Sequence, residues 1–203
     1  MDLEERIGEL AHEHGMHTVV LYGSRARGDA TAESDVDVAG FADVATTTRD
    51  ARPWHGVFLD AFVYPTAQTE SNEPDMLKLL GGRVLLDERG LARPMLARLE
   101  ALDRAGPPPL AADEAQMRRV WYAKTLARIT RGDAEAHYRQ HWLLYSLLED
   151  HFALRGAWYR GPKVALAHLR EHEPATFAAF ARALAPGAPY PALAELVAIV
   201  TAE

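Results

Sequence analysis

The sequence predicts an α/β (α+β) domain with a mixed sheet, followed by an all-helical domain. In the first half, three short apolar runs are typical of buried strands: residues 17–22, 35–41 and 57–64. A stretch with three consecutive prolines, Pro107 to Pro109, then interrupts the chain, because proline cannot continue a helix. Beyond it, apolar residues recur at helical spacing. We therefore expect an α/β domain at 1–104, a linker at 105–112 and a helical domain at 113–203.

The first part is predicted to begin with an amphipathic helix at residues 2–14, because its apolar residues fall on one helical face. Asp2 and Glu5 have the types and the spacing of a capping box. Gly15 suits the end of this helix, where a left-handed backbone conformation is common.

The remaining elements of the first part are less regular. Residues 42–53 are polar and are predicted to form a loop between the second and third strands. A short helix is expected at 72–80, and two glycines end it. An edge strand at 83–86 and a helix at 91–104 complete this part.

The second part is predicted to be a helical bundle, since helical periodicity continues through it. Five helices are expected, at residues 113–130, 134–154, 162–172, 174–184 and 190–201.

Composition limits the function. The chain has 203 residues, 48% of them hydrophobic, and no cysteine, which excludes disulfides and thiolate metal sites. Its formal net charge of −7 disfavours broad nucleic-acid binding, which needs a basic surface. No apolar run is long enough to span a membrane, and the acidic first residues differ from a signal peptide. We expect a soluble cytoplasmic protein with no membrane partner.

The stretch Gly23-Ser24-Arg25-Ala26-Arg27-Gly28 directly follows the first predicted strand. Gly23 has no Cβ, so the backbone can turn sharply there and approach a ligand closely. Ser24 can cap a short helix, and its hydroxyl and the free backbone N–H groups can meet phosphate oxygens. This combination indicates nucleotide binding at Gly23 and Ser24.

Two carboxylates follow, in Ser34-Asp35-Val36-Asp37-Val38. Side chains alternate along a strand, so Asp35 and Asp37 are predicted to share one face. Adjacent carboxylates repel unless a cation lies between them, and oxygen ligands suit Mg²⁺. Asp60, in the third predicted strand, can join them, and three carboxylates can hold two metal ions. The alternative for Asp60 is a buried, hydrogen-bonded role.

A Gly-Ser pair, an Asp-x-Asp pair and a third Asp on a later strand resemble the DNA polymerase β-type nucleotidyltransferase superfamily. The fuller motif at 23–38 is similar to its small bacterial branch, which includes minimal nucleotidyltransferases and the aminoglycoside (kanamycin-type) and lincosamide enzymes. The resemblance implies that a nucleoside monophosphate passes from an NTP to an acceptor, with release of pyrophosphate. It further implies that Asp35, Asp37 and Asp60 hold two Mg²⁺ ions, that Asp60 helps to activate the acceptor, and that the triphosphate binds at Gly23 and Ser24.

Two further residues match the branch motif, Arg27 and Ser34, and both are candidates for nucleotide binding. Arg27 can neutralise phosphate charge through its planar set of donors. Its alternative role is a salt bridge to a nearby acid, such as Asp29, that fixes the loop. Arg25 is expected to face solvent.

The helical part resembles, in order and helicity, the bundle that follows the catalytic domain of kanamycin-type enzymes, where it helps to form the acceptor site. Lys163 falls in the first turn of a predicted helix, where the helix dipole disfavours a cation. That position indicates an anion, such as the triphosphate, near Lys163. The alternative is a solvated lysine offset by nearby acids.

Glu149 is a candidate general base, as an acid from the helical domain is in kanamycin-type enzymes. It lies on a stripe at helical spacing that contains Tyr138, Trp142, Tyr145 and Phe152. Such stripes are usually core, in which case Glu149 only hydrogen-bonds. Asp150 is the adjacent alternative, and Tyr159 can either line an acceptor pocket or pack in the core.

Taken together, these features predict a Mg²⁺-dependent nucleotidyltransferase that acts on a hydroxyl of a small-molecule acceptor, such as an antibiotic. Two alternatives remain open. One is a protein-AMPylating, antitoxin-like enzyme with a HEPN-type protein partner, and the other is a nucleotide-binding scaffold without catalysis.

Overall fold

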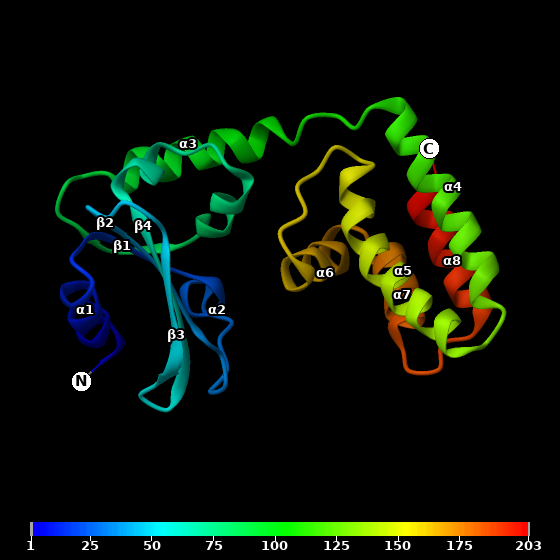
Figure 1. The fold of residues 1–203 in the computed structure, drawn as a ribbon, viewed down its shortest axis with the longest axis horizontal. Coiled ribbons are helices and arrows are strands. Elements are labelled where there is room, and N and C mark those ends of the chain that lie inside the picture. Colours follow the sequence, from blue (N-terminus) through cyan, green and yellow to red (C-terminus); the bar gives the residue numbers. More distant parts are fainter. Residues whose placement is uncertain (1, 203) are drawn as a thin grey trace. The chain divides into compact units, whose positions relative to one another are not determined.

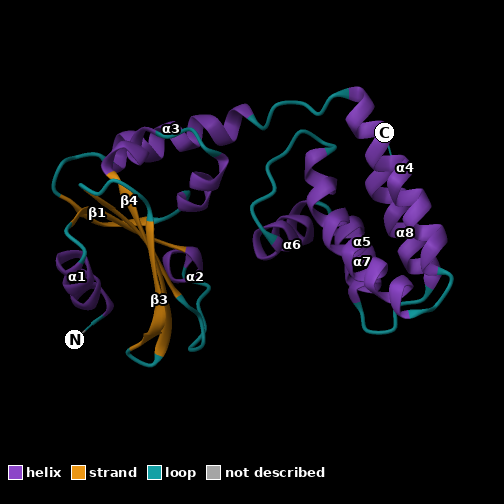
Figure 2. Ribbon diagram, viewed as in Figure 1, coloured by secondary structure: helices purple, strands orange, loops and turns teal. Residues whose placement is uncertain are grey.

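The computed structural model describes residues 2–202. The chain divides into two compact units, Met1–Ala105 and Gly106–Glu203, and the division falls in the stretch predicted as a linker. Among the described residues, strands occur only in the first unit, and the second unit is built from helices and loops (Figure 2).

The first unit contains a five-stranded mixed sheet (Figure 1). Its elements are α1 (Leu3–Glu13), β1 (Met16–Tyr22), α2 (Gly23–Arg27), β2 (Val36–Ala42), β3 (Thr48–Trp54), β4 (Val57–Pro65), the 3-10 helices η1 (Thr66–Glu70) and η2 (Pro74–Leu79), β5 (Arg83–Asp87) and α3 (Ala92–Ala105). The strand order is β3-β4-β2-β1-β5. Strands β2 and β4 run parallel, and the other neighbouring pairs are antiparallel.

Helix α1 covers one face of this sheet. Its buried residues, Ile7, Leu10 and Ala11, belong to one core with the alternate residues of β1, β2 and β4. The predicted capping box is present, since the Asp2 carboxylate accepts from the Glu5 N–H and the Glu5 carboxylate accepts from the Asp2 N–H. The opposite face of the sheet carries Asp37 and Asp60, as their register shows.

The prediction of a loop across 42–53 is wrong, because residues 48–54 form strand β3. This strand lies at the edge of the sheet and pairs only with β4, so it carries no apolar run that marks a buried strand. Along β3, half-buried side chains alternate with exposed ones instead. Pro53 fits here because an edge strand tolerates a missing N–H donor.

The second unit consists of α4 (Ala112–Ile129), α5 (Ala134–Ala153), α6 (Pro162–His172), α7 (Pro174–Leu184) and α8 (Tyr190–Thr201). A single apolar core joins all five, with Leu143, Leu147, Leu169, Phe180 and Leu196 fully or almost fully buried. These bounds lie within two residues of the predicted helices, and the predicted fold class is confirmed. No helix in the described part of the chain is both long enough and apolar enough to cross a membrane.

Candidate active site

Two of the predicted carboxylates, Asp37 and Asp60, are neighbours across a parallel strand pair. Asp37 on β2 is in register with Asp60 on β4, so both side chains start from the same face of the sheet at adjacent positions. Asp35 is exposed and lies in the loop just before β2. The structure therefore brings Asp37 and Asp60 together on adjacent strands, and Asp35 lies two residues before Asp37 in the chain.

The turn at Gly23 lies directly against Asp37. Gly23 follows Tyr22, which is in register with Asp37, and its φ of +71° is in the left-handed region. A Cβ at this position would lie 2.1 Å from Asp37 Oδ2, far inside van der Waals contact. Glycine is thus required twice, by the backbone angle and by the carboxylate. Ser24, the next residue, is buried at the start of α2.

Arg25 does not face solvent as the sequence suggested. It is half-buried, and its Nε donates to the carbonyl oxygens of Ser34 at 3.2 Å and Asp35 at 3.0 Å. Its Nη2 donates to the Ser34 carbonyl at 2.6 Å. Arg25 therefore ties the backbone before β2 to helix α2 and positions Asp35. Backbone carbonyls leave no signal in a sequence, which is why this role was missed.

The other two motif residues have local partners. Arg27 Nη2 lies 3.4 Å from Asp29 Oδ1, and both side chains are well exposed, which matches the salt-bridge alternative. The Ser34 hydroxyl accepts from the Thr31 N–H at 2.9 Å and so closes the turn before Asp35. Their predicted role in nucleotide binding stays a prediction.

Asp60 carries a cationic partner that the sequence analysis did not anticipate. Arg49 of β3 donates through Nε to Asp60 Oδ1 at 2.7 Å and through Nη2 to Oδ2 at 2.9 Å. Both carboxylate oxygens are thus engaged in a bidentate pair. Hydrogen bonding to Asp60 raises the pKa of the Arg49 guanidinium, which stays charged. Arg49 was missed because it falls in the stretch predicted as a loop.

A second cation, Lys78 of η2, lies over aromatic rings on the same face. Its Nζ is 4.1 Å from the ring centre of Phe62 and 5.6 Å from those of Tyr22 and Tyr64. These are cation–π distances. Burial, followed by the charge of Asp37, raises the pKa of Tyr22, so its hydroxyl stays protonated. The acids therefore share their face with two cations and a floor of aromatic rings.

The donor set at this end of the sheet fits a hard divalent cation. Carboxylate oxygens are its preferred ligands, and the missing Cβ at Gly23 leaves Asp37 approachable. As the side chains stand, no group of three or more His, Cys, Asp or Glu within residues 2–202 forms a metal site. Arg49 holds the place beside Asp60 where a cation is expected. The metal roles of Asp35, Asp37 and Asp60 stay predictions.

The two remaining candidates belong to the second unit. Glu149 is exposed on α5, and Lys163 is exposed in the first turn of α6. Asp150, the alternative base, is buried and accepts hydrogen bonds from Arg118 and the Tyr122 hydroxyl. Its oxygens are therefore committed to the helical core, whereas Glu149 presents its carboxylate to solvent. The predicted roles of Glu149 and Lys163 stay predictions.

The interpretation of the aromatic stripe on α5 as core is wrong for three of its four members. Tyr138, Trp142 and Tyr145 are 74%, 49% and 63% exposed, and only Phe152 is buried. The leucines of α5 occupy its core-facing side instead, which leaves most of the stripe on the surface.

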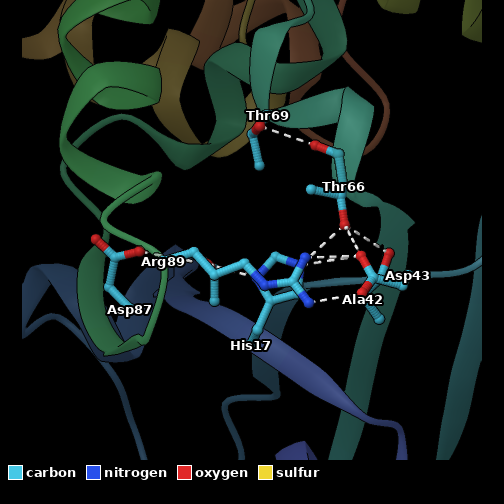
Figure 3. Close-up of polar contacts among 8 residues, drawn as sticks. His17, Ala42, Asp43, Thr66, Thr69, Asp87 and Arg89 are labelled. Atoms are coloured by element: carbon cyan, nitrogen blue, oxygen red, sulfur yellow. Dashed lines mark hydrogen bonds and ion pairs between the residues drawn. The ribbon is translucent and has the colours of Figure 1, made fainter.

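A separate polar cluster lies at the other end of β1 and β2 (Figure 3). The His17 ring bonds to the Thr66 hydroxyl through Nε2 at 2.9 Å and to the Thr18 hydroxyl through Nδ1 at 3.0 Å. Thr66 donates to Asp43, which also forms a bidentate pair with Arg89. Burial, and then the charge of Arg89, lowers the pKa of His17. The cluster ties β1, the end of β2 and the loop after β5 together.

Residues 3–69 match the family model of the nucleotidyltransferase domain. The matched residues lie within the first unit, which is therefore similar to a nucleotidyltransferase domain. The match spans Gly23, Ser24 and all three acids, and it confirms the predicted enzyme class at the level of this domain. It does not distinguish the kanamycin-type branch, which stays a prediction.

Among curated proteins, none matches this sequence. The solved structure of a nucleotidyltransferase-like protein from Exiguobacterium sibiricum 255-15 is similar over 98% of this chain and 72% of its own, with 12% identity and a TM-score of 0.42.

Proposed function

We propose that this chain transfers a nucleoside monophosphate from an NTP to a hydroxyl group of a small-molecule acceptor and releases pyrophosphate. The observation that carries the proposal is the contact of the Gly23 turn with Asp37, next to Asp60. This contact places a turn of the kind that can bind phosphate beside two carboxylates on adjacent strands. The nucleotidyltransferase domain match over the same residues supports it.

In this proposal, Asp35, Asp37 and Asp60 hold Mg²⁺. When bound, the metal stabilises the negative charge of the attacking and leaving oxygens. The backbone and hydroxyl at Gly23 and Ser24 hold the triphosphate. The acceptor oxygen forms a bond to the α-phosphorus, the bond from that phosphorus to the bridging oxygen breaks, and pyrophosphate leaves with the electron pair. Once Arg49 no longer bonds to the Asp60 carboxylate, Asp60 receives the proton of the acceptor hydroxyl.

The residues around Asp60 support this division of roles. Arg49 neutralises Asp60 in the absence of ligand, and its guanidinium suits a phosphate as well as a carboxylate. A triphosphate therefore offers Arg49 an alternative partner, which frees the Asp60 oxygens. Lys78 adds positive charge on the same face, where a polyanion is expected.

A small-molecule acceptor agrees with the charge of the chain. A net charge of −7 argues against broad binding of a nucleic-acid acceptor. No comparison favours a HEPN-type partner.

The test is calorimetric titration of ATP, GTP, CTP and UTP in the presence of Mg²⁺. The wild type is compared with Asp37→Asn and with Glu9→Gln, an exposed acid on α1, on the other side of the sheet. We expect metal-dependent binding of at least one nucleotide, its loss in Asp37→Asn, and wild-type behaviour in Glu9→Gln. Equal nucleotide binding by the wild type and Asp37→Asn, or no binding of any NTP, contradicts the proposal.

A further inference from the structure

The helical unit contains a pocket of about 510 Å³ that is formed by this unit alone. One wall is α5, a second is the start of α6 with the segment before it, and the third is the turn after α7. Its principal lining residues are Leu144, Tyr145, Leu148, Tyr159, Leu166 and Leu184. The volume lies in the range of pockets that hold small organic molecules.

The floor of the pocket is apolar and anchored in the core. Leu144 and Leu148 are buried on α5, and Leu166 packs against the same core from α6. At the mouth, Tyr145 is 63% exposed and Leu184 is 46% exposed. The removal of these exposed apolar side chains from water by a ligand is favourable.

The pocket is lined by few polar side chains. The amide of Gln140, the ring of His141 and the hydroxyls of Tyr145 and Tyr159 lie around it. Burial, together with the nearby Tyr145, raises the pKa of Tyr159, so the Tyr159 hydroxyl is a protonated donor. Within the described residues, no Asp, Glu, Lys or Arg lines the pocket.

This chemistry selects the ligand. A polycation such as an aminoglycoside needs carboxylates, and a phosphate needs arginine, lysine or a set of free N–H groups. A neutral molecule with an apolar ring system fills the leucine floor without an unpaired buried charge. Its hydroxyl or carbonyl groups can bond to the tyrosine hydroxyls and the Gln140 amide.

We propose that this pocket binds a small, uncharged, ring-bearing molecule that has a few hydrogen-bonding groups at its edge. The proposal is independent of nucleotidyl transfer and of the metal site in the first unit, so each can fail without the other.

The experiment uses N-phenyl-1-naphthylamine, an uncharged ring compound whose fluorescence rises in apolar surroundings, on the full-length chain. We expect a saturable, one-site rise in fluorescence with the wild type. Leu184→Arg, which places a charge at the mouth, is expected to weaken binding at least tenfold, and Tyr145→Ala several-fold. Both side chains are exposed, so both variants should fold, and circular dichroism checks this.

The matched control is Val120→Arg on α4, which introduces the same charge at a residue that is 56% exposed and is not part of the pocket. It is expected to bind the probe like the wild type, and kanamycin is expected not to displace the probe. The proposal is overturned by non-saturable binding, by equal binding to folded Leu184→Arg and Tyr145→Ala, by an equal loss in Val120→Arg, or by displacement with kanamycin.

Discussion

Arg49 of β3 reaches diagonally across the antiparallel pair β3–β4 to Asp60, and its guanidinium binds both oxygens of the carboxylate. The pair is asymmetric, because Arg49 is 55% exposed whereas Asp60 is 20% exposed. The acid is therefore fixed at the site, and the cation is the partner that can move. Divalent metal and Arg49 should compete for the same oxygens.

Replacing Arg49 with alanine is expected to tighten Mn²⁺ binding. Ion pairs with an exposed partner are weak, so removal of the competitor should improve the affinity by up to about fivefold. Isothermal titration of Mn²⁺ without nucleotide measures this directly. Nucleotide affinity should fall in the same variant, because the triphosphate loses a cation.

Arg52→Ala is the matched control for this change. Arg52 lies on the same strand, but it pairs with Glu13 of α1 and with Asp50. We expect its Mn²⁺ affinity to equal that of the wild type. An unchanged affinity in Arg49→Ala would show that metal and Arg49 do not share Asp60.

Gly23→Ala is expected to damage the site more than the fold. The substitution adds a left-handed alanine, at a cost of about 1–2 kcal/mol, and a Cβ that collides with Asp37 Oδ2. A carboxylate displaced by about 1 Å can lower turnover on the order of a hundredfold. Pyrophosphate release and urea unfolding separate the two effects.

Gly28→Ala carries the same backbone penalty without the collision. Its φ is +82°, and a Cβ there would meet no atom within 4 Å. Both variants should lose similar stability, but only Gly23→Ala should lose metal-dependent nucleotide binding. Equal binding by the two alanine variants would remove Gly23 from the site.

Much of the fold could be predicted from the sequence, because apolar periodicity reports burial directly. Strands β1, β2 and β4 and all the helices of the second unit were predicted in this way. Edge strand β3 was not predicted, because few of its side chains are buried, and the role of Arg49 on this strand was therefore not predicted either. The glycine and aspartate motif indicated the candidate site, which stays a prediction, but the Arg25 contacts to backbone carbonyls depend on tertiary structure alone.

Arg25→Ala should loosen the segment before β2. A hydrogen bond from a charged group contributes about 1.5–3 kcal/mol, and the loss of even one corresponds to roughly tenfold in an equilibrium. We expect faster amide exchange at Thr31 to Asp35 and about tenfold weaker nucleotide binding. Arg27→Ala, which removes an exposed pair with Asp29, should leave amide exchange in that segment unchanged. If amide exchange at Thr31 to Asp35 is as slow in Arg25→Ala as in the wild type, contacts other than those of Arg25 hold this segment in place.

The buried His17 should make the stability of the first unit depend on pH. Its pKa is lowered by burial and by Arg89, whereas in the unfolded chain it returns to about 6.5. Below that pH, His17 binds a proton in the unfolded state more readily than in the folded state. The free energy of unfolding therefore falls as the pH drops. Above it, His17 is neutral in both states and its contribution is complete.

Urea unfolding at pH 8, 7, 6 and 5 measures this dependence. His17→Gln keeps a hydrogen-bonding side chain toward Thr66 but cannot titrate, so its stability should decline less than that of the wild type below pH 6.5. His137→Gln, at an exposed position, should follow the wild type. Parallel curves for the wild type and His17→Gln would mean that Asp43, Asp87 and Glu88, which favour the charged ring, offset its burial completely.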